Sequence, residues 1–259
     1  MAGVEVYLFD AGRGLLTPVG EGAAIRIHTC LPERLAGEPV ELGSMRPFGL
    51  YELLRRVLER EGLLVRFVSH PREDGDTTFE RVGERALREA PDPSLCPSAR
   101  VETPEPSVGE AERCIDLVLS GAEGPVERSP HTVRSRPKFR DAQAEFGYPA
   151  LVLYLLGAHY SQPLDDPLSG LPEARARAER IREVGATLRA GEPSPPEMRD
   201  HLSAFRLSLA RDLDTPSALR ALFDWLREAE LCEEPVGDSD LHEMLALLEL
   251  EELEELEED

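Results

Sequence analysis

The back half of the chain carries apolar residues at helical spacing, and this pattern restricts it to helices that pack on one another. Between residues 171 and 190 the apolar side chains recur at steps of three and four, with arginines on the opposite face. The stripe consists of Leu171, Ala174, Ala178, Ile181, Val184 and Leu188. Such spacing predicts an amphipathic helix that buries one face. The pattern also predicts helices at 149–160, about 196–211, 215–230 and 238–256, and therefore a helical bundle.

Two positions in this region have a specific interpretation. Thr215 stands directly before Pro216, which is the arrangement of an N-cap followed by proline at the first helical position. Trp225, the only tryptophan, lies at helical spacing from Leu222 and Leu226. We therefore expect Trp225 in the core rather than as a stacking platform for a base.

The front half combines helix and strand patterns. Residues 50–62 have the apolar spacing of an amphipathic helix, with Gly62 as the expected stop. Residues 64–69 predict a buried strand. The proline-rich stretches 90–106 and 191–196 predict loops, and the second should separate a central helical region from a terminal bundle.

Charge argues against an RNA-binding role. The formal net charge is −22, and lysine occurs once. Because RNA affinity rests on neutralising phosphates, so acidic a chain would need a segregated basic patch. The best candidate is Arg134, Arg136, Lys138 and Arg140. A solvated linker is the favoured interpretation of this stretch, so tRNA is not an expected partner.

Much of the acidity lies in residues 248–259. Leucines at 247, 248, 250, 253 and 256 form a narrow helical stripe, and the remaining face is carboxylate. Like charges at helical spacing destabilise an isolated helix. A helix would persist only where these leucines dock, on their own domain or on a basic partner; a frayed acidic tail is the favoured interpretation.

The sequence contains neither a membrane-spanning pattern nor a secretory signal. No apolar run approaches the ~20 residues needed to span a bilayer, and the N-terminus lacks a charged segment followed by an apolar one. We therefore expect a cytoplasmic protein with reduced thiols and no membrane partner.

Two segments of the back half resemble cysteinyl-tRNA synthetases. Residues 149–164, PALVLYLLGAHYSQPL, resemble the family's ALR-x-FLL-x-AHYRSPL-like segment, and residues 211–219, RDLDTPSAL, resemble its DDFNTP-x-AL segment. By this resemblance His159 falls in a structural motif, so a hydrogen-bonded structural histidine is expected there rather than a catalytic one.

The resemblance extends to the front half. Residues 5–30 are similar to the family's opening hairpin and to its first core strand, which ends in a cysteine, here Cys30. Residues 102–121 resemble a helix of the family. The resemblance thus implies an α/β plus α chain: a partial class I synthetase-type (Rossmann-like) nucleotide-binding fold, followed by an α-helical bundle like the synthetase C-terminal domain.

The family's HIGH-type signature corresponds to residues 41–48, ELGSMRPF. Gly43 and Arg46 match the family pattern, while Glu41 and Ser44 occupy the polar positions that hold ATP phosphates in the family. A carboxylate at Glu41 would repel a triphosphate. Ser44 could still donate one hydrogen bond. These four residues are the candidates for a degenerate nucleotide site.

A long middle segment of the family has no counterpart here. About twenty residues separate Gly121 from Asp141, and none of them matches the KMSKS loop beyond Lys138. The resemblance implies that three zinc ligands are lost with this segment, which leaves Cys30 as an orphan ligand candidate. The other cysteines show no metal-ligand spacing, so all four are expected to be buried or incidental thiols and zinc is not expected.

These observations predict three regions and a function. The regions are a truncated Rossmann-like domain at 1–140, a helical connection at 141–192 and a helical bundle with an acidic tail at 193–259. The preferred hypothesis is a synthetase-like pseudoenzyme that has lost tRNA charging and acts through a protein partner. The alternative is an adenylate-forming cysteine ligase, or residual cysteine–tRNA ligase activity. Binding of ATP, an adenylate or an amino acid stays open.

Overall fold

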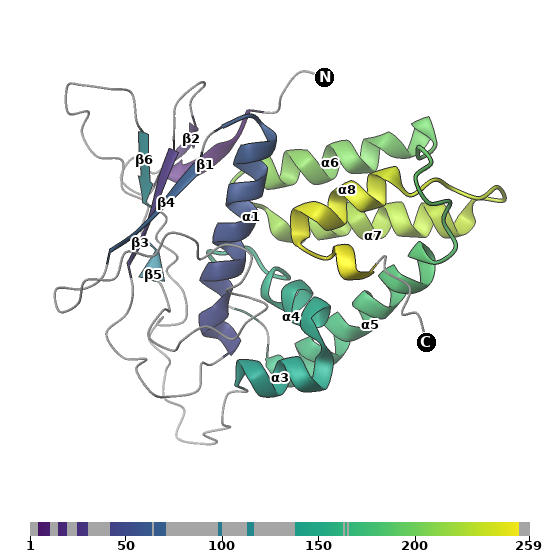
Figure 1. Cartoon of the computed structure of the whole chain (residues 1–259), viewed down its shortest axis with the longest axis horizontal. Helices are drawn as coiled ribbons and strands as arrows, with labels where there is room; N and C mark the ends of the chain where they lie inside the picture. The colour runs from purple at the N-terminus through teal and green to yellow at the C-terminus, as the bar shows by residue number, and fades with distance from the viewer. Residues whose placement is uncertain are drawn as a thin grey trace.

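The computed structural model describes residues 5–10, 15–19, 25–30, 42–63, 65–70, 98–99, 113–116, 138–162, 164 and 166–253. Within these residues, a small strand-containing part lies on one side of helix α1 (Arg46–Arg60), and a group of helices lies on its other side (Figure 1). The expected combination of a sheet followed by helices is therefore confirmed in its coarse form.

The first strands form the expected hairpin. Strand β1 (Tyr7–Asp10) pairs antiparallel with β2 (Leu15–Pro18). The hairpin also reaches the helical region, since Tyr7 forms a parallel bridge with Arg211. Residues about two hundred positions apart are thus joined through backbone contacts.

Strand β3 (Ile25–Cys30) is the centre of the second sheet. It pairs in parallel with β4 (Val65–His70) and with β6 (Arg113–Asp116), and antiparallel with the short β5 (Ser98–Ala99). Helix α1 lies between β3 and β4 in the sequence, and parallel neighbours require such a crossover. The predicted strand at 64–69 and the strand ending at Cys30 are confirmed.

Strand β6 corrects the helix that the resemblance implied at 102–121. Residues 113–116 pair with β3 from Ile25 opposite Arg113 to His28 opposite Asp116. This pairing satisfies backbone groups of β3 that a helix would leave without partners. The rest of the 102–121 stretch lies outside the described residues.

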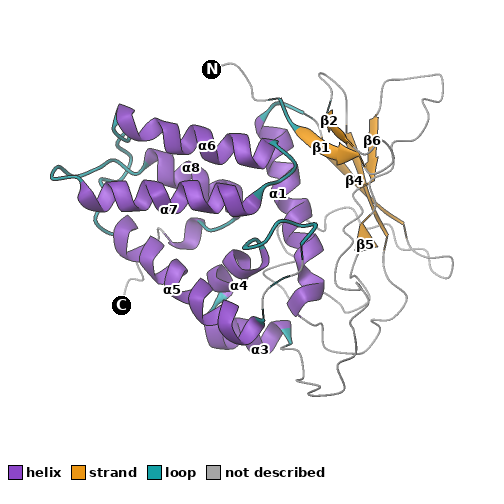
Figure 2. Cartoon of the chain, turned by 180° about the vertical axis from the view of Figure 1, so that it is seen from behind, coloured by secondary structure: helices purple, strands orange, loops and turns teal. Residues whose placement is uncertain are grey.

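The remaining elements are helical (Figure 2). The α-helices are α3 (Phe139–Phe146), α4 (Tyr148–Leu155), α5 (Pro167–Gly185), α6 (Arg199–Ala210), α7 (Thr215–Leu231) and α8 (Ser239–Leu248). Short 3-10 turns lie at η1 (Leu42–Met45), η3 (Pro196–Met198) and η4 (Glu251–Leu253). The helices that apolar spacing predicted are all present, with different ends.

Helix ends are set by local contacts that spacing alone did not reveal. The N-cap of α7 is Asp214, whose carboxylate accepts a hydrogen bond from the Ser217 amide at 3.1 Å. Thr215 is the first helical residue, so the prediction of Thr215 as N-cap was wrong by one position. Helix α4 ends at Leu155, short of the predicted end at 160, and every one of its residues is buried.

The leucine stripe at the C-terminal end is docked as far as the structure follows it. Leu247, Leu248, Leu250 and Leu253 are buried. Helix α8 ends at Leu248 because Glu249 adopts the left-handed conformation, with φ of 63°. The prediction of a frayed tail is therefore wrong up to Leu253. The prediction of one continuous helix over 238–256 is also wrong. Residues 254–259 lie outside the described part.

One hydrophobic cluster runs through α1 and the helices that follow it. Trp225, Phe139 and Phe205 are among its largest fully buried side chains, and α1 contributes Leu50 and Leu54. The core position expected for Trp225 is confirmed. Because α1 shares this cluster, it packs as part of the helical region, while the boundaries at 140 and 192 stay predictions.

A buried carboxyl in the first turn of α8 makes stability depend on pH. Asp240 is 8% exposed, and burial raises its pKa, with Glu243 adding to the effect and Arg199 opposing it. A raised pKa in the folded state means that the charged carboxylate destabilises the fold at neutral pH and that this penalty disappears as pH falls. Asp240→Asn should therefore raise the free energy of unfolding at pH 7, with a smaller gain in acid. Urea unfolding at both pH values measures the difference, and an equal effect at both would contradict it.

Candidate functional site

Arg46 lies at the start of α1 and joins segments that are far apart in the sequence. Its Nη2 donates to the backbone oxygens of Ala158 at 2.6 Å and His159 at 2.7 Å, and Nη1 donates to that of Gln162 at 2.6 Å. The side chain is buried, and burial lowers its pKa below the usual value. A planar guanidinium can serve several carbonyl oxygens at once. We call Arg46, residues 158–162 and residues 211–215 the junction.

The two loops of the junction are also bound to each other. His159 Nε2 lies 3.0 Å from the Asp212 backbone oxygen, and the Tyr160 hydroxyl donates to the Asp212 carboxylate at 2.6 Å. Burial and the Asp212 carboxylate raise the pKa of Tyr160, so this hydroxyl stays protonated and donates. The hydrogen bonding expected for His159 is confirmed.

Turn 211–215 adopts a conformation that needs such support. Asp212 and Leu213 have φ of 60° and 49°, in the left-handed region that side chains with a Cβ rarely occupy. Each such residue costs on the order of 1 kcal/mol or more unless the surroundings impose it. The Asp212 amide donates to the Tyr7 backbone oxygen at 2.7 Å, and Leu213 is fully buried. The hairpin and the core thus hold the turn in place.

The signature-like residues do not all face one site in the described structure. Glu41 lies outside the described residues, and for Ser44 only the backbone, in η1, is described. Gly43 is exposed, and a Cβ there would meet open space. Arg46 is directed into the junction, with its Nη atoms on three carbonyl oxygens. A nucleotide site at these positions stays a prediction.

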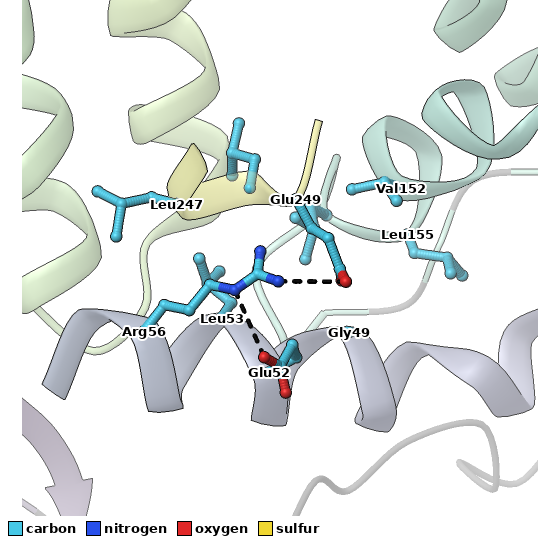
Figure 3. A pocket seen from close by; sticks show the side chains of 10 residues that line it. Gly49, Glu52, Leu53, Arg56, Val152, Leu155, Leu247 and Glu249 are labelled. Carbon is cyan, nitrogen blue, oxygen red and sulfur yellow. Dashed lines mark ion pairs between the residues drawn. The ribbon is translucent and has the colours of Figure 1, made fainter. Parts of the chain in front are cut away.

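A pocket lies beside the junction, between α1, α4 and the end of α8 (Figure 3). Its empty volume is about 310 Å³, which includes space open to solvent. The apolar walls are Leu53, Val152, Leu155, Leu156, Leu247 and Leu248. Its charged groups are Glu52 and Arg56 of α1 and Glu249, which follows α8.

Arg56 sits between the two carboxylates of this pocket. Its Nε lies 3.4 Å from Glu52 Oε1, and its Nη2 lies 3.1 Å from Glu249 Oε1. Glu249 also accepts a hydrogen bond from the Tyr148 hydroxyl at 3.1 Å. Since buried charges persist only when paired, the three groups compensate one another. The arrangement therefore fastens the end of α8 to α1 and α4.

A second charged contact extends this attachment. Oε1 of Glu243, in α8, lies 2.6 Å from Nη2 of Arg60, in the last turn of α1. The same carboxylate accepts from Nε of Arg206 in α6 at 2.5 Å. Three helices are therefore tied at one carboxylate, although this contact is more exposed than that of Arg56.

The other predicted site residues are spread over the structure. Cys30 ends β3, and only its backbone is described; Cys232 is an exposed free thiol. Within the described ranges, no three His, Cys, Asp or Glu side chains lie close enough to hold a metal ion. Arg134 and Arg136 lie outside those ranges, Lys138 precedes α3 and is half-buried, and exposed Arg140 lies in its first turn. A basic RNA-binding patch here stays a prediction.

Sequence reasoning did not identify Asp212 as a partner of His159 and Tyr160, nor Arg56 and Glu249 as a buried pair. The signal for Asp212 was its place in the segment that resembles the family's DDFNTP motif. No sequence signal distinguishes Glu249 from the carboxylates that follow it.

No helix in the described part combines the length and apolar character that crossing a membrane requires.

Comparisons with known proteins place the chain near one group of ligases. No protein-family model matches it. It is 34% identical to the cysteine–tRNA ligase of Rubrobacter xylanophilus over 90 residues, which cover 33% of this chain and 19% of that protein. It is 35% identical to the cysteine–tRNA ligase of Halorhodospira halophila over 100 residues, which cover 39% of this chain and 21% of that protein.

A related ligase of another kind also matches. The L-cysteine:1D-myo-inositol 2-amino-2-deoxy-alpha-D-glucopyranoside ligase of Nocardiopsis dassonvillei is 40% identical over 78 residues, which cover 30% of this chain and 18% of that protein. These matches span about a fifth of each relative's length. Over roughly a third of its own length, the chain is thus related to the cysteine–tRNA ligase family.

Proposed function

We propose that this protein is a cysteine–tRNA ligase-like binding protein that does not charge tRNA. The observation that carries the proposal is the position of Arg46, the only basic residue in the signature-like segment 41–48. Its guanidinium is buried against three carbonyl oxygens of the junction. With Arg46 engaged in this way, and with Glu41 and Ser44 at the positions that hold phosphates in the ligase family, segment 41–48 offers no free cation to a triphosphate.

The arrangement around β3 supports the same proposal. Strand β3, helix α1 and strand β4 form a parallel crossover unit, the building block of nucleotide-binding folds. In such folds the ligand lies beyond the carboxyl ends of the strands, which is where the signature-like segment follows β3. The acidic side chain of Glu41 in that segment would repel phosphates. The proposed class I-type fold would then serve as a scaffold.

The proposed mode of action is binding of another protein. The chain is strongly acidic, and the segments that resemble the ligase family are engaged in internal contacts, as Arg46, His159 and Asp212 illustrate. This favours a protein partner over tRNA. Resident zinc is not expected, because the cysteines lack the spacing of metal ligands. We further propose a cytoplasmic location.

Calorimetry with a non-hydrolysable cysteinyl-adenylate analogue tests the proposal, with seryl and alanyl analogues as matched controls. The binding protein proposed here should give no cysteine-selective heat at any attainable concentration. Selective binding of the cysteinyl analogue would contradict it, because that result requires a shaped pocket for both the amino acid and the nucleotide.

A second candidate function is an adenylate-forming cysteine ligase. It is favoured by the match to the Nocardiopsis dassonvillei protein, whose name describes a ligase that takes L-cysteine and an amino sugar. The double variant Glu41→His and Ser44→Asn separates the two functions. If the variant gains affinity for the adenylate analogue, a cleft is present and the ligase is favoured. Unchanged affinity favours the scaffold.

A further inference from the structure

His159 has a defined tautomer because of the groups around it. Its Nδ1 lies 3.4 Å from the Ser161 amide nitrogen, which can only donate. Nδ1 must therefore be an acceptor, so the proton of the neutral ring is on Nε2. Nε2 then donates to the Asp212 backbone oxygen at 3.0 Å. In this tautomer the unprotonated nitrogen, Nδ1, is directed at Ser161.

The Ser161 hydroxyl uses this basic nitrogen. Its Oγ lies 2.7 Å from Nδ1 and therefore donates its proton there. Ser161 is exposed, so a reagent can reach Oγ from solvent. On the far side of the ring, the Asp212 carboxylate Oδ2 lies 3.6 Å from Nε2, close enough to stabilise a positive charge on the imidazole. A hydroxyl that donates to a base, with the base held by a backbone oxygen and a carboxylate nearby, resembles the arrangement of an activated nucleophile.

The geometry points to Ser161 as an acyl-accepting serine, with His159 as general base and Asp212 as the residue that positions it. The co-reactant is an activated acyl ester or mixed anhydride. Ser161 Oγ attacks the acyl carbon as its proton passes to His159 Nδ1. The bond from the acyl carbon to its leaving group breaks, the leaving group departs with the electron pair, and the imidazolium returns its proton to water. The product is an O-acyl serine.

The fold gives this pair a fixed backbone. Arg46 binds the carbonyl oxygens of His159 and Gln162, on either side of Ser161. The His159 and Tyr160 rings also lie close together, with centroids 4.3 Å apart. A base held in this way stays within reach of its hydroxyl, which is the condition for general base catalysis. The inference does not depend on whether the protein binds nucleotides.

Acetylation by p-nitrophenyl acetate provides the test. The full chain is treated with the ester, digested, and the acetylated serines are quantified by mass spectrometry. Ser203 is the matched control, because it is also exposed but its hydroxyl donates to the Arg199 backbone oxygen and has no base. Ser161 should be labelled at least about tenfold faster than Ser203.

The variant His159→Gln sharpens the test, because its side-chain amide can still donate to Asp212 but is not a base. Labelling of Ser161 should drop to the level of Ser203, while thermal unfolding shows whether the variant is folded. Equal labelling of Ser161 and Ser203 in the unsubstituted protein would overturn the inference, whatever the variant does. So would unchanged labelling of Ser161 in a folded His159→Gln protein.

Discussion

Replacing Arg46 by methionine should lower the free energy of unfolding by about 2 to 4 kcal/mol, because it removes charge-assisted hydrogen bonds from a buried guanidinium to three carbonyl oxygens. The loss stays below the sum for three such bonds because the oxygens of Ala158 and His159 keep partners, the Thr215 hydroxyl and the Gln162 amide. Urea unfolding measures the change.

Two further variants separate the guanidinium's geometry from its charge. Arg46→Lys keeps the charge but cannot bind three oxygens as a planar group, so it should still cost about 1 to 2 kcal/mol. Arg140→Met alters an exposed arginine and should change stability by less than about 0.5 kcal/mol. If Arg46→Met were as mild as Arg140→Met, Arg46 would not support the junction, and a role in binding an anion would become the better explanation.

Arg56→Met should cost about 3 to 5 kcal/mol, which is typical when one member of a buried ion pair is removed. The side chain of Glu249 is only 6% exposed, so its carboxylate would lose a compensating charge without gaining access to water. Glu52, 5% exposed, would keep its ion pair with Arg55. Glu249 would keep the hydrogen bond from the neutral Tyr148 hydroxyl, which does not replace the charge of Arg56. Because Arg56 joins α1 to the end of α8, the loss should also loosen the C-terminal segment.

A double-mutant cycle isolates the pair. Glu249→Gln removes the charge and retains the shape, so it should offset part of the cost of Arg56→Met and give a coupling energy of about 1 to 3 kcal/mol. The matched control is Arg175→Met, since Arg175 forms a surface pair with Glu179 and both side chains are about half exposed. That change should cost no more than about 0.5 kcal/mol. If the changes in unfolding free energy for Arg56→Met and Glu249→Gln were strictly additive, the claim that this pair attaches the end of α8 to α1 would be refuted.

Helices α5 and α7 were predictable because each buries a stripe that the sequence shows directly. The spacing of Leu171, Ala178 and Val184 is the periodicity of α5 itself, and Trp225 lies in the core as its spacing predicted. The ends were less predictable because caps depend on one side chain. Asp214 rather than Thr215 caps α7, since its carboxylate reaches the Ser217 amide.

The contacts of the junction and the pocket depend on residues that meet only in the folded chain. Arg46 lies more than a hundred positions from the loop it holds, and its match to a signature suggested a nucleotide rather than carbonyl oxygens. Glu249 is one of many C-terminal carboxylates. Its left-handed backbone and its ion pair with Arg56 distinguish it, and both are visible only in the folded chain. The strand at 113–116 was missed because its partner β3 lies far away in sequence.

The most direct test of the central claim is cysteine-dependent charging of tRNA by the purified protein. The assay uses tRNA for cysteine, ATP and labelled cysteine, with an active cysteine–tRNA ligase as the positive control. A binding protein built on a ligase-like scaffold should transfer no cysteine above the level found without enzyme. Charging that depends on ATP and is selective for cysteine over serine would contradict the account and establish the chain as an active ligase.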